Sequence, residues 1–447
     1  MLKSATNHYL GGFSQGPTNF DFDECLLILR DGTEIFIDSL VAQIKIVESI
    51  QRVATLVNVS IVDTHDFIDL LKLDGTEKIK FIISRKEPNG ELKKFEREVI
   101  IAEIAGYKRI NPGTLTYTLS CIPEFAYLNQ YKTISKHVSG SFQNSIKNIC
   151  IGDLSINNSD LEISESGTAF KCIIPRMKPI FAINWLLRNA DDGGTPYYFY
   201  QKANGKICCR SKKEMISDGI YNTYDNKPFF NIEKPVNEDD DTGKMEYFEE
   251  LQKKITRDRS EIKMSKFYSG AEGSYGATVH HIDIAEKIYD TTVYEFKNKN
   301  LLNENPPLAS DSKIANTDIK TFTEGRNYFI NKNTLAFDDS NNYHENITSK
   351  SLGEMMSHKA LNDTTAQRFE IPGDFDLHAG AVINLELLRV AEIEDTLNNL
   401  SEVLSGKHLV TTVEHLFQPS GYTMVVSAKK DSFITSLDKR RVRNEER

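Results

Sequence analysis

Two glycine-containing stretches have the residue types of a catalytic or phosphate-binding loop. Residues 12–16, Gly-Phe-Ser-Gln-Gly, match the nucleophile-elbow pattern, in which a strand-to-helix turn presents a reactive serine, here Ser14. Only eleven largely polar residues precede this stretch, so the pattern lacks the core strand that an elbow requires. Residues 270–276, Gly-Ala-Glu-Gly-Ser-Tyr-Gly, resemble a phosphate loop without its Lys-Ser/Thr ending. We expect neither stretch to be catalytic, since glycines that let a strand approach another backbone explain the second one.

Three further groups of residues could bind a metal ion or react as thiols. His280 and His281 are adjacent, and adjacent residues of a strand point to opposite faces, so they cannot readily share one ion. The acidic run 238–241 lacks the alternate-residue spacing of a calcium loop and is typical of a solvated loop. No Cys-x-x-Cys pair is present, and we expect most of the six cysteines to be buried thiols: Cys25, Cys121, Cys150, Cys172, Cys208 and Cys209. The sequence therefore predicts no catalytic residue, no metal site and no cofactor.

Charge and hydropathy argue against two classes of protein. The formal net charge is −10 at pH 7, whereas proteins that bind DNA or anionic membranes without sequence preference need an excess of Lys and Arg. Apolar runs fall far short of the roughly 20 residues of a membrane helix, and the N-terminus lacks the apolar core of a signal peptide. We expect a protein that is made and kept in a cytoplasm, with 447 residues that allow two to four domains.

The elements that must position any site are mostly strands, and two hairpins are the clearest of them. Apolar and polar residues alternate around residues 418–421, Gln-Pro-Ser-Gly, and again around residues 111–113, Asn-Pro-Gly. In both, a phenylalanine stands twelve positions after the turn glycine, but the apolar phase slips by one residue relative to Gly113 and Gly421. The pattern predicts a duplicated strand unit with a bulge or a one-residue shift, against the alternative of two unrelated hairpins.

Weaker patterns give the remaining elements. Strands are predicted at residues 40–50, 53–62, 78–84, 95–104, 262–268 and 277–296. Apolar residues from Ile134 to Ile149 recur at helical spacing, with a break expected at Gly140. Another helix is predicted to begin at Pro179 and to stop at residues 191–194, Asp-Asp-Gly-Gly. Regular short strands of this kind favour a barrel or a sandwich.

Several stretches stand in the order found in one family. They are residues 56–63 followed by 70–77, residues 173–187, residues 273–283, and residues 377–383 leading to 405–415. In these packing and turn patterns the sequence resembles the central baseplate hub protein of T-even-type contractile phage tails. That protein is related to the N-terminal hub part of type VI secretion spike proteins.

The resemblance implies a mainly β fold with α+β insertions, in which two related antiparallel tail-tube-like β-barrels accompany a mixed α/β region. The boundaries that it implies are 1–125 for the first tube-like barrel, 126–257 for a mixed α+β region with polar loops, 258–300 and 365–435 for the second tube-like barrel, 301–364 for a polar insertion, and 436–447 for a basic C-terminal tail.

The resemblance also implies a structural, non-enzymatic late protein of the virion, located at the centre of the tail baseplate and assembled in the host cytoplasm. Three copies would form a pseudo-hexameric ring that adapts a threefold tail spike below to a sixfold tail tube, or tube-initiator protein, above. Baseplate wedge and tape-measure proteins are further candidate partners. DNA would pass through the axial channel only in transit during ejection, and no stable membrane association is expected.

Other functions make different demands on the sequence. A type VI-like or tailocin spike hub would be built on the same structural principle, and a spike domain would then be expected to follow the barrels. A baseplate-associated cell-wall hydrolase needs a catalytic carboxylate or nucleophile constellation, which none of the motifs above supplies. A glycan-binding tail protein fits the strand content but gives no reason for two related barrels.

Overall fold

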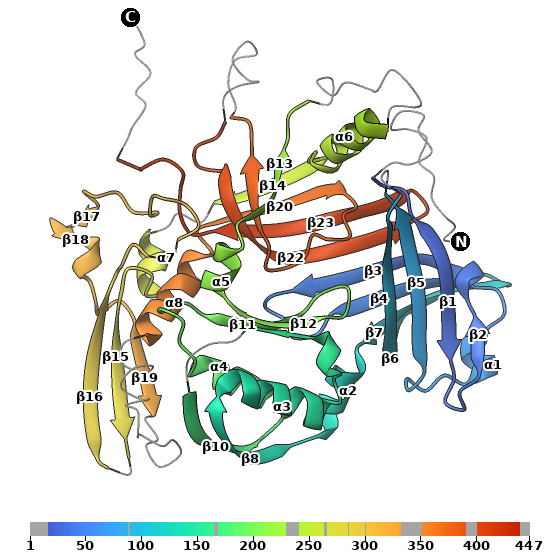
Figure 1. Ribbon diagram of the computed structural model, residues 1–447, viewed down its shortest axis with the longest axis horizontal. Helices are drawn as coiled ribbons and strands as arrows, with labels where there is room; N and C mark the ends of the chain where they lie inside the picture. The colour runs from blue at the N-terminus through green and yellow to red at the C-terminus, as the bar shows by residue number, and fades with distance from the viewer. Residues whose placement is uncertain are drawn as a thin grey trace, which may run out of the picture.

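The computed structural model is built around one large, mostly antiparallel sheet of thirteen strands (Figure 1). The structure describes residues 17–87, 90–164, 169–228, 241–262, 266–284, 286–299, 301–331, 351–389 and 400–438. The strands of this sheet are β1 (Asp21–Ile28), β2 (Glu34–Phe36), β3 (Val41–Ser49), β4 (Leu56–Asp63), β5 (Lys78–Lys86), β6 (Leu92–Asn111), β7 (Thr114–Ile122), β13 (Ile220–Asp225), β14 (Arg257–Ile262), β20 (Thr365–Pro372), β21 (Val382–Glu386), β22 (Gly406–Gln418) and β23 (Gly421–Lys430). Their order is β14-β20-β23-β22-β3-β4-β7-β6-β5-β1-β2, with β21 beside β22 and β13 beside β21. The predicted mainly β class with α+β insertions is confirmed.

Two six-strand units within this sheet have the same arrangement. The first lies in the sheet as β3-β4-β7-β6-β5-β1 and the second as β14-β20-β23-β22-β21-β13. Corresponding strands also follow one another along the chain in the same relative order. Strand directions agree at every pair but the last, since β13 is parallel to β21 whereas β1 is antiparallel to β5. The two hairpins predicted from the sequence, β6–β7 and β22–β23, therefore occupy equivalent places in two units of the same strand order.

The register explains the one-residue slip between these hairpins. The β6–β7 loop consists of residues 112–113, and the β22–β23 loop consists of residues 419–420. Gly113 is thus the second loop residue and corresponds to Ser420, whereas Gly421 is already the first residue of its strand. The two turn glycines thus stand one position apart in two loops of equal length, which accounts for the one-residue slip in the sequence.

With the loops superposed, the buried faces of the two hairpins agree. Four buried residues of β7 fall on four buried residues of β23, in the order Leu115, Tyr117, Leu119 and Cys121 on Tyr422, Met424, Val426 and Ala428. A bulge also stands at the same place in each hairpin, between Ile101 and Glu103 in β6 and between Val410 and Thr412 in β22. A bulge shared at one register position is a feature of the common unit rather than a local irregularity.

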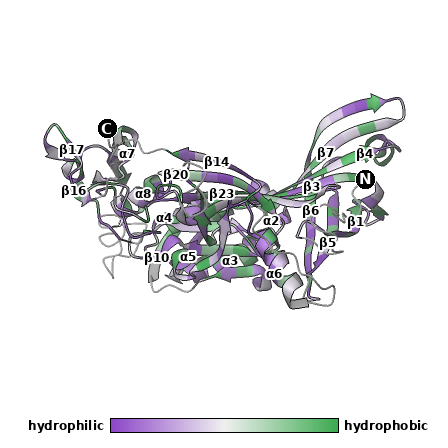
Figure 2. Ribbon diagram, turned by 90° about the horizontal axis from the view of Figure 1, so that it is seen from above, coloured by the Kyte–Doolittle hydropathy of each residue, from purple (hydrophilic) through white to green (hydrophobic). Residues whose placement is uncertain are grey.

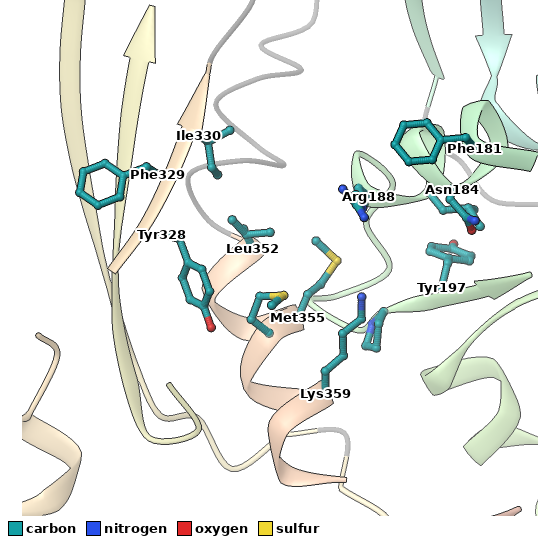
Figure 3. Close-up of a pocket in the computed structure, with 13 residues that line it drawn as sticks. Phe181, Asn184, Arg188, Tyr197, Tyr328, Phe329, Ile330, Leu352, Met355 and Lys359 are labelled. Carbon is teal, nitrogen blue, oxygen red and sulfur yellow. The ribbon is translucent and has the colours of Figure 1, made fainter. Parts of the chain in front are cut away.

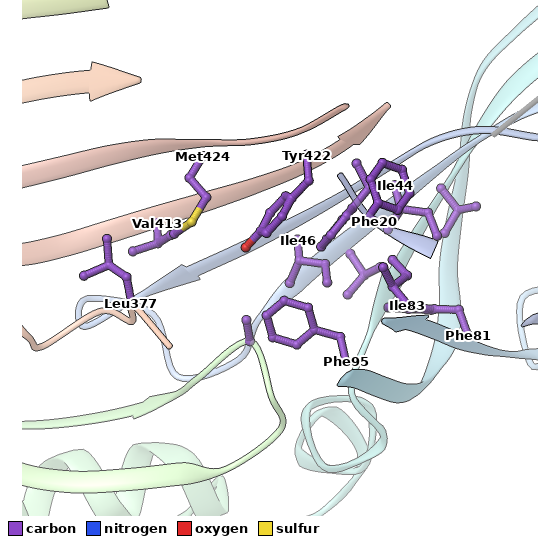
Figure 4. Packing of buried hydrophobic residues seen from close by; sticks show 14 of the residues in the cluster. Phe20, Ile44, Ile46, Phe81, Ile83, Phe95, Leu377, Val413, Tyr422 and Met424 are labelled. Carbon is purple, nitrogen blue, oxygen red and sulfur yellow. The ribbon is translucent and has the colours of Figure 1, made fainter. Parts of the chain in front are cut away.

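The two units share a single hydrophobic core. Ile44 and Ile46 of β3 lie in one cluster with Val413 of β22, and all three are fully buried (Figure 4). Nearby, the ring of Phe417 stacks on that of Tyr422 with centroids 4.3 Å apart. Because side chains from both units fill this cluster, the strands assigned to two predicted barrels form one sheet over one core.

The mixed region has a core of its own, beside the sheet (Figure 1). Its elements are α2 (Glu124–Tyr131), β8 (Ile134–Ser141), α3 (Phe142–Leu154), η3 (Asn158–Asp160), β9 (Leu161–Ile163), β10 (Ala169–Met177), α4 (Pro179–Arg188), β11 (Tyr197–Gln201), β12 (Ile207–Ser211) and α5 (Lys212–Ser217). The helix predicted to begin at Pro179 is confirmed. The helical interpretation of residues 134–141 is wrong, because β8 pairs with β10 and α3 starts only after Ser141, whose hydroxyl accepts the N–H of Asn144.

A large insertion separates β14 from β20, its partner in the sheet. It contains α7 (Lys266–Ala271), β15 (Gly276–Asp283), β16 (Ile288–Glu295), β17 (Lys313–Ile314), β18 (Thr317–Asp318), η5 (Ile319–Thr321), β19 (Asn327–Asn331) and α8 (Leu352–Leu361). The strand predicted at 262–268 is wrong over its second half, which begins α7. β15 pairs with β16 and β19 instead of joining the second unit, because β19, from the predicted polar insertion, supplies its second partner. The insertion thus spans residues 263–364.

The described residues include three further helices, which lie outside the mixed region and the insertion. They are η2 (Asp38–Leu40), α1 (Phe67–Leu71) and α6 (Asp241–Gln252). Of the helices in the described ranges, none combines the length and the apolar character needed to cross a membrane. Residues 436–438 of the predicted basic tail are described, and the basic cluster after them lies outside the described residues.

Candidate assembly interface

The two adjacent histidines noted in the sequence, His280 and His281, lie on β15 in a small three-stranded sheet. On β15, the ring nitrogens of His280 contact the Tyr289 hydroxyl at 2.6 Å and Asn327 Oδ1 at 3.1 Å, while His281 is buried. Within the described part of the chain, no group of three or more His, Cys, Asp and Glu side chains could hold a metal ion. Ser14 and the acidic residues 238–240 lie outside the described residues.

The glycine-rich stretch 270–276 joins α7 to β15. Gly273 has a φ of +81°, a conformation that favours glycine. A Cβ added at Gly276 would stand 2.6 Å from the carbonyl oxygen of Phe322. At Gly276 the two backbones approach each other more closely than a residue with a side chain would allow. The glycines at positions 273 and 276 are therefore explained by the backbone structure, without a phosphate-binding role.

All six cysteines are free and buried, which confirms the predicted buried thiols. Burial raises the pKa of Cys25, Cys150 and Cys172 to about 12. At neutral pH these side chains are protonated thiols, and a protonated thiol is a poor nucleophile and a poor metal ligand.

The contact between the two units is a strand pair within one chain. Residues 412–417 of β22 pair with residues 44–49 of β3. On the face of the sheet away from the core, Glu414 lies 2.6 Å from the Lys45 ammonium and 3.1 Å from the Arg368 guanidinium. A backbone ladder and a cluster of three charges thus hold one unit beside the other.

Besides β2 and β13, which each pair with one strand, β14 and the outer part of β6 have open edges in the described sheet. β14 pairs only with β20, and all six of its residues are exposed. β6 pairs with β5 along residues 92–100, so residues 102–111 pair with β7 alone. Figure 2 shows this hairpin projecting beyond the rest of the sheet, and Tyr107 and Ile110 near its tip are 56% and 60% exposed. Open strand edges are templates for pairing with another chain.

The face of the sheet opposite the core is rich in hydroxyl and amide groups. Partly exposed residues of β4 and β7 on this face include Asn58, Ser60, Thr116, Thr118 and Ser120, and those of β23 include Thr423 and Ser427. Three of its cations are engaged within the chain, since Lys45 and Arg368 are paired with Glu414, and Lys429 is paired with Asp363. The exposed Arg259 lies opposite Arg368 on the same face. Part of the positive charge of this face is therefore neutralised within the chain.

Glu48, at the end of β3, ties both units to the mixed region. Its fully buried carboxylate accepts the N–H of Ala379 at 2.6 Å and the N–H of Ala203. Buried Arg97 donates to the carbonyl of Ala203 at 2.6 Å. Burial raises the pKa of Glu48 to about 7, although the two N–H donors and the cations of Lys202 and Arg97 act in the opposite direction.

This shift predicts a pH dependence of stability. Because Glu48 binds its proton more tightly in the folded protein, the resulting stabilisation is present below pH 4.5 and is lost as the pH rises through about 7. The difference is on the order of 3 kcal/mol. We expect the unfolding temperature of the unchanged protein to fall more between about pH 5 and pH 8 than that of Glu48→Gln, which cannot titrate. Parallel pH dependences of the two proteins, measured by calorimetry, would contradict this expectation.

A second candidate surface is a crevice of about 510 Å³ between the mixed region and the insertion (Figure 3). Phe181 and Arg188 of α4 line one side, and Tyr328 of β19 and Met355 and Lys359 of α8 line the other. Burial and the neighbouring Arg188 lower the pKa of Lys359. No Asp, Glu or His is among the described residues that line it, so it offers no carboxylate or imidazole for acid–base chemistry.

No protein-family model and no curated protein sequence matches the chain. Solved structures do match its fold. The chain is similar to the tail protein from Neisseria meningitidis MC58, with 10% identity, coverage of 91% of this chain and 96% of that chain, and a TM-score of 0.53. It is also similar to the 43 kDa tail protein of prophage MuSo2 from Shewanella oneidensis, with 9% identity, 92% and 99% coverage, and a TM-score of 0.47. A third match, with 9% identity, 88% and 74% coverage and a TM-score of 0.42, is a type VI secretion system component from Escherichia coli.

At such low identity, the likeness to the Neisseria tail protein shows the fold alone. This chain shares the fold of that tail protein, and the resemblance drawn from the sequence is confirmed at the level of the fold. The sequence did not point to the open edge of β14, because its six residues include four charged ones and no apolar alternation. Charged residues commonly protect an edge strand from pairing with the wrong chain, so the four charged residues of β14 were the one feature of the sequence that could have indicated an edge strand.

Proposed function

We propose that this chain is the structural hub of a contractile-tail baseplate, and that three copies form a ring of six related units. The observation that carries the proposal is the pair of units with one strand order, joined side by side in a single sheet. A ring of three such chains presents six similar units on one rim and three identical chains overall. It can therefore bind a sixfold tube on one side and a threefold spike on the other.

The residues on the face of the sheet opposite the core are consistent with a face that lines the axial channel. If that face lines the axis, passing DNA meets hydroxyl and amide groups such as Asn58 and Thr118, while the cations Lys45 and Arg368 are engaged by Glu414. Affinity for DNA comes mainly from Lys and Arg contacts to phosphates, so such a lining would retain DNA weakly during ejection. We assign the chain a structural rather than an enzymatic role at the centre of the virion baseplate.

Partners at the periphery would meet the elements outside the duplicated sheet. The insertion at residues 263–364 and the crevice beside α8 are present once per chain, so they would occur three times around the ring. Baseplate wedge proteins are the candidate partners for these surfaces. The tube or tube-initiator protein and the spike would contact the two rims, and the tape-measure protein would contact the channel.

The test is the mass and symmetry of the assembled protein. The chain is co-expressed with the neighbouring tail proteins, its mass is measured by light scattering, and particles are averaged in the electron microscope. We expect a complex with three copies of the chain and a ring with threefold symmetry and a pseudo-sixfold rim. A monomer or dimer without a channel, in the presence of those partners, would overturn the proposal. Co-expression matters because a hub interface can depend on its partners.

A further inference from the structure

The junction between β22 and β3 is a template for a contact between copies of the chain. In the alignment of the two units, β22 corresponds to β6 and β3 corresponds to β14. β6 and β14 also each have an open edge. Moreover, the open stretch of β6, residues 102–111, contains the equivalents of residues 412–417, the part of β22 that pairs with β3.

We propose that β14 of one copy pairs antiparallel with residues 104–109 of β6 in a second copy, so that the β22–β3 junction is repeated between chains. The inference deepens the proposed trimer and rests on it, because this contact made three times closes a ring of six units. In the closed ring, neither of these two edges remains open. Closing a sheet into a ring removes such edges and so prevents unwanted pairing with other chains.

The superposition of the units fixes the register of this contact. Through the hairpin partners β7 and β23, Ala105 corresponds to Glu414. Through β4 and β20, which pair with the same hairpin strands, Glu261 corresponds to Val47. Since Glu414 pairs with Val47 inside the chain, Ala105 of one copy should lie opposite Glu261 of the next.

Neighbouring positions of this register are largely complementary. Ile262, which is 47% exposed, falls opposite the partly exposed Ile104, so both gain an apolar partner. Further along, Arg109 falls opposite Asp258, a pair of opposite charge. Lys108 falls opposite Arg259, and this like-charge pair weakens the contact locally. The bulge between Ala105 and Lys108 gives that part of β6 freedom to adjust.

A pair of cysteines across the expected contact tests both the contact and its register. Residues directly opposite in an antiparallel pair have Cα atoms about 4.5–5.5 Å apart, which lies within the range that a disulfide spans. The variant carries Ala105→Cys with Glu261→Cys and is co-expressed with the neighbouring tail proteins. All six native cysteines are buried, which limits unrelated cross-links.

Three controls accompany this variant. Each single substitution should give no cross-linked species. The pair Ala105→Cys with Arg257→Cys is four residues out of register on β14. The pair Glu414→Cys with Val47→Cys occupies the equivalent position inside one chain, so it should form a disulfide without any increase in covalent mass.

The readouts are a non-reducing gel and the mass of the same sample in solution. We expect covalent dimers and trimers that disappear with reductant, at least about tenfold more than in the out-of-register pair, whose Cα atoms are too far apart. A trimer by mass that stays unlinked, or that links out of register, would overturn this inference and leave the proposed trimer standing. A monomer in the presence of the partners would overturn both.

Discussion

Lys212→Met is expected to destabilise the protein by about 3–5 kcal/mol, because it leaves a buried carboxylate without its cation. The Lys212 ammonium lies 2.5 Å from Asp431, and both side chains have no exposed area. Asp431 also accepts the N–H of Leu302 at 3.0 Å, and Lys212 donates to Asn362 at 2.8 Å. This pair thus connects α5 of the mixed region to the end of β23 and to two places in the insertion, Leu302 in its interior and Asn362 near its end. Chemical denaturation followed by circular dichroism measures the loss.

A neighbouring residue supplies the matched control. Lys213 pairs with Asp192 at 3.0 Å, but its side chain is 52% exposed, so Lys213→Met should cost less than about 1 kcal/mol. Adding Asp431→Asn to Lys212→Met should restore part of the lost stability, because the buried charge is then removed as well. Equal effects of Lys212→Met and Lys213→Met would mean that the buried pair contributes no more than a surface one.

Arg85→Met is the second substitution for which we expect a loss of about 3–5 kcal/mol. The buried Arg85 guanidinium donates to Glu87 at 2.6 Å and to the carbonyls of Pro17 at 3.0 Å and Gly373 at 2.6 Å. Its carbon also lies 5.0 Å from the centre of the Phe375 ring. Removing the guanidinium leaves Glu87 and two carbonyl groups without these donors, in a place where water reaches them poorly.

The location of Arg85 sharpens this prediction. Arg85 belongs to β5 of the first unit, whereas Gly373 follows β20 of the second, so the substitution should weaken both units together. Arg30→Met is the control, since Arg30 pairs with Asp74 at 2.7 Å on a side chain that is 54% exposed. Hydrogen exchange should show faster opening in both units of the Arg85 variant. Faster exchange confined to β5 and its neighbours would contradict a role between the units.

Much of the sheet could be predicted from the sequence because each central strand buries one face on a shared core. Period-two alternation is strong in β4 and β7, where every second residue is buried, and it located these strands to within a few residues. The same signal is absent from β14, which has no buried face and is held only by β20. Its place in the second unit follows from pairing, which a local pattern does not encode.

The helical interpretation of residues 134–141 failed for a related reason. Ile134 and Val138 are spaced as on a helix, but the stretch finds a partner strand in β10, some thirty residues later. Pairing of residues 134–141 with β10 therefore outweighed the helical spacing, and only the part from Phe142 onward forms a helix. Likewise, nothing in the spacing of Glu48, Lys212 or Asp431 indicates that these charges are buried, because burial depends on which distant elements meet.

The position of the insertion carries a consequence for the descent of this chain. In the first unit, residues 50–55 connect β3 to β4, and in the second unit residues 263–364 make the equivalent connection from β14 to β20. The strand order survived this difference, since the register of each strand constrains its neighbours, whereas doubling a surface loop costs only about 0.6 kcal/mol in closure entropy. If the two units arose by duplication of one unit, they diverged in this connection while their strand order stayed the same, and the insertion is a later acquisition of one half.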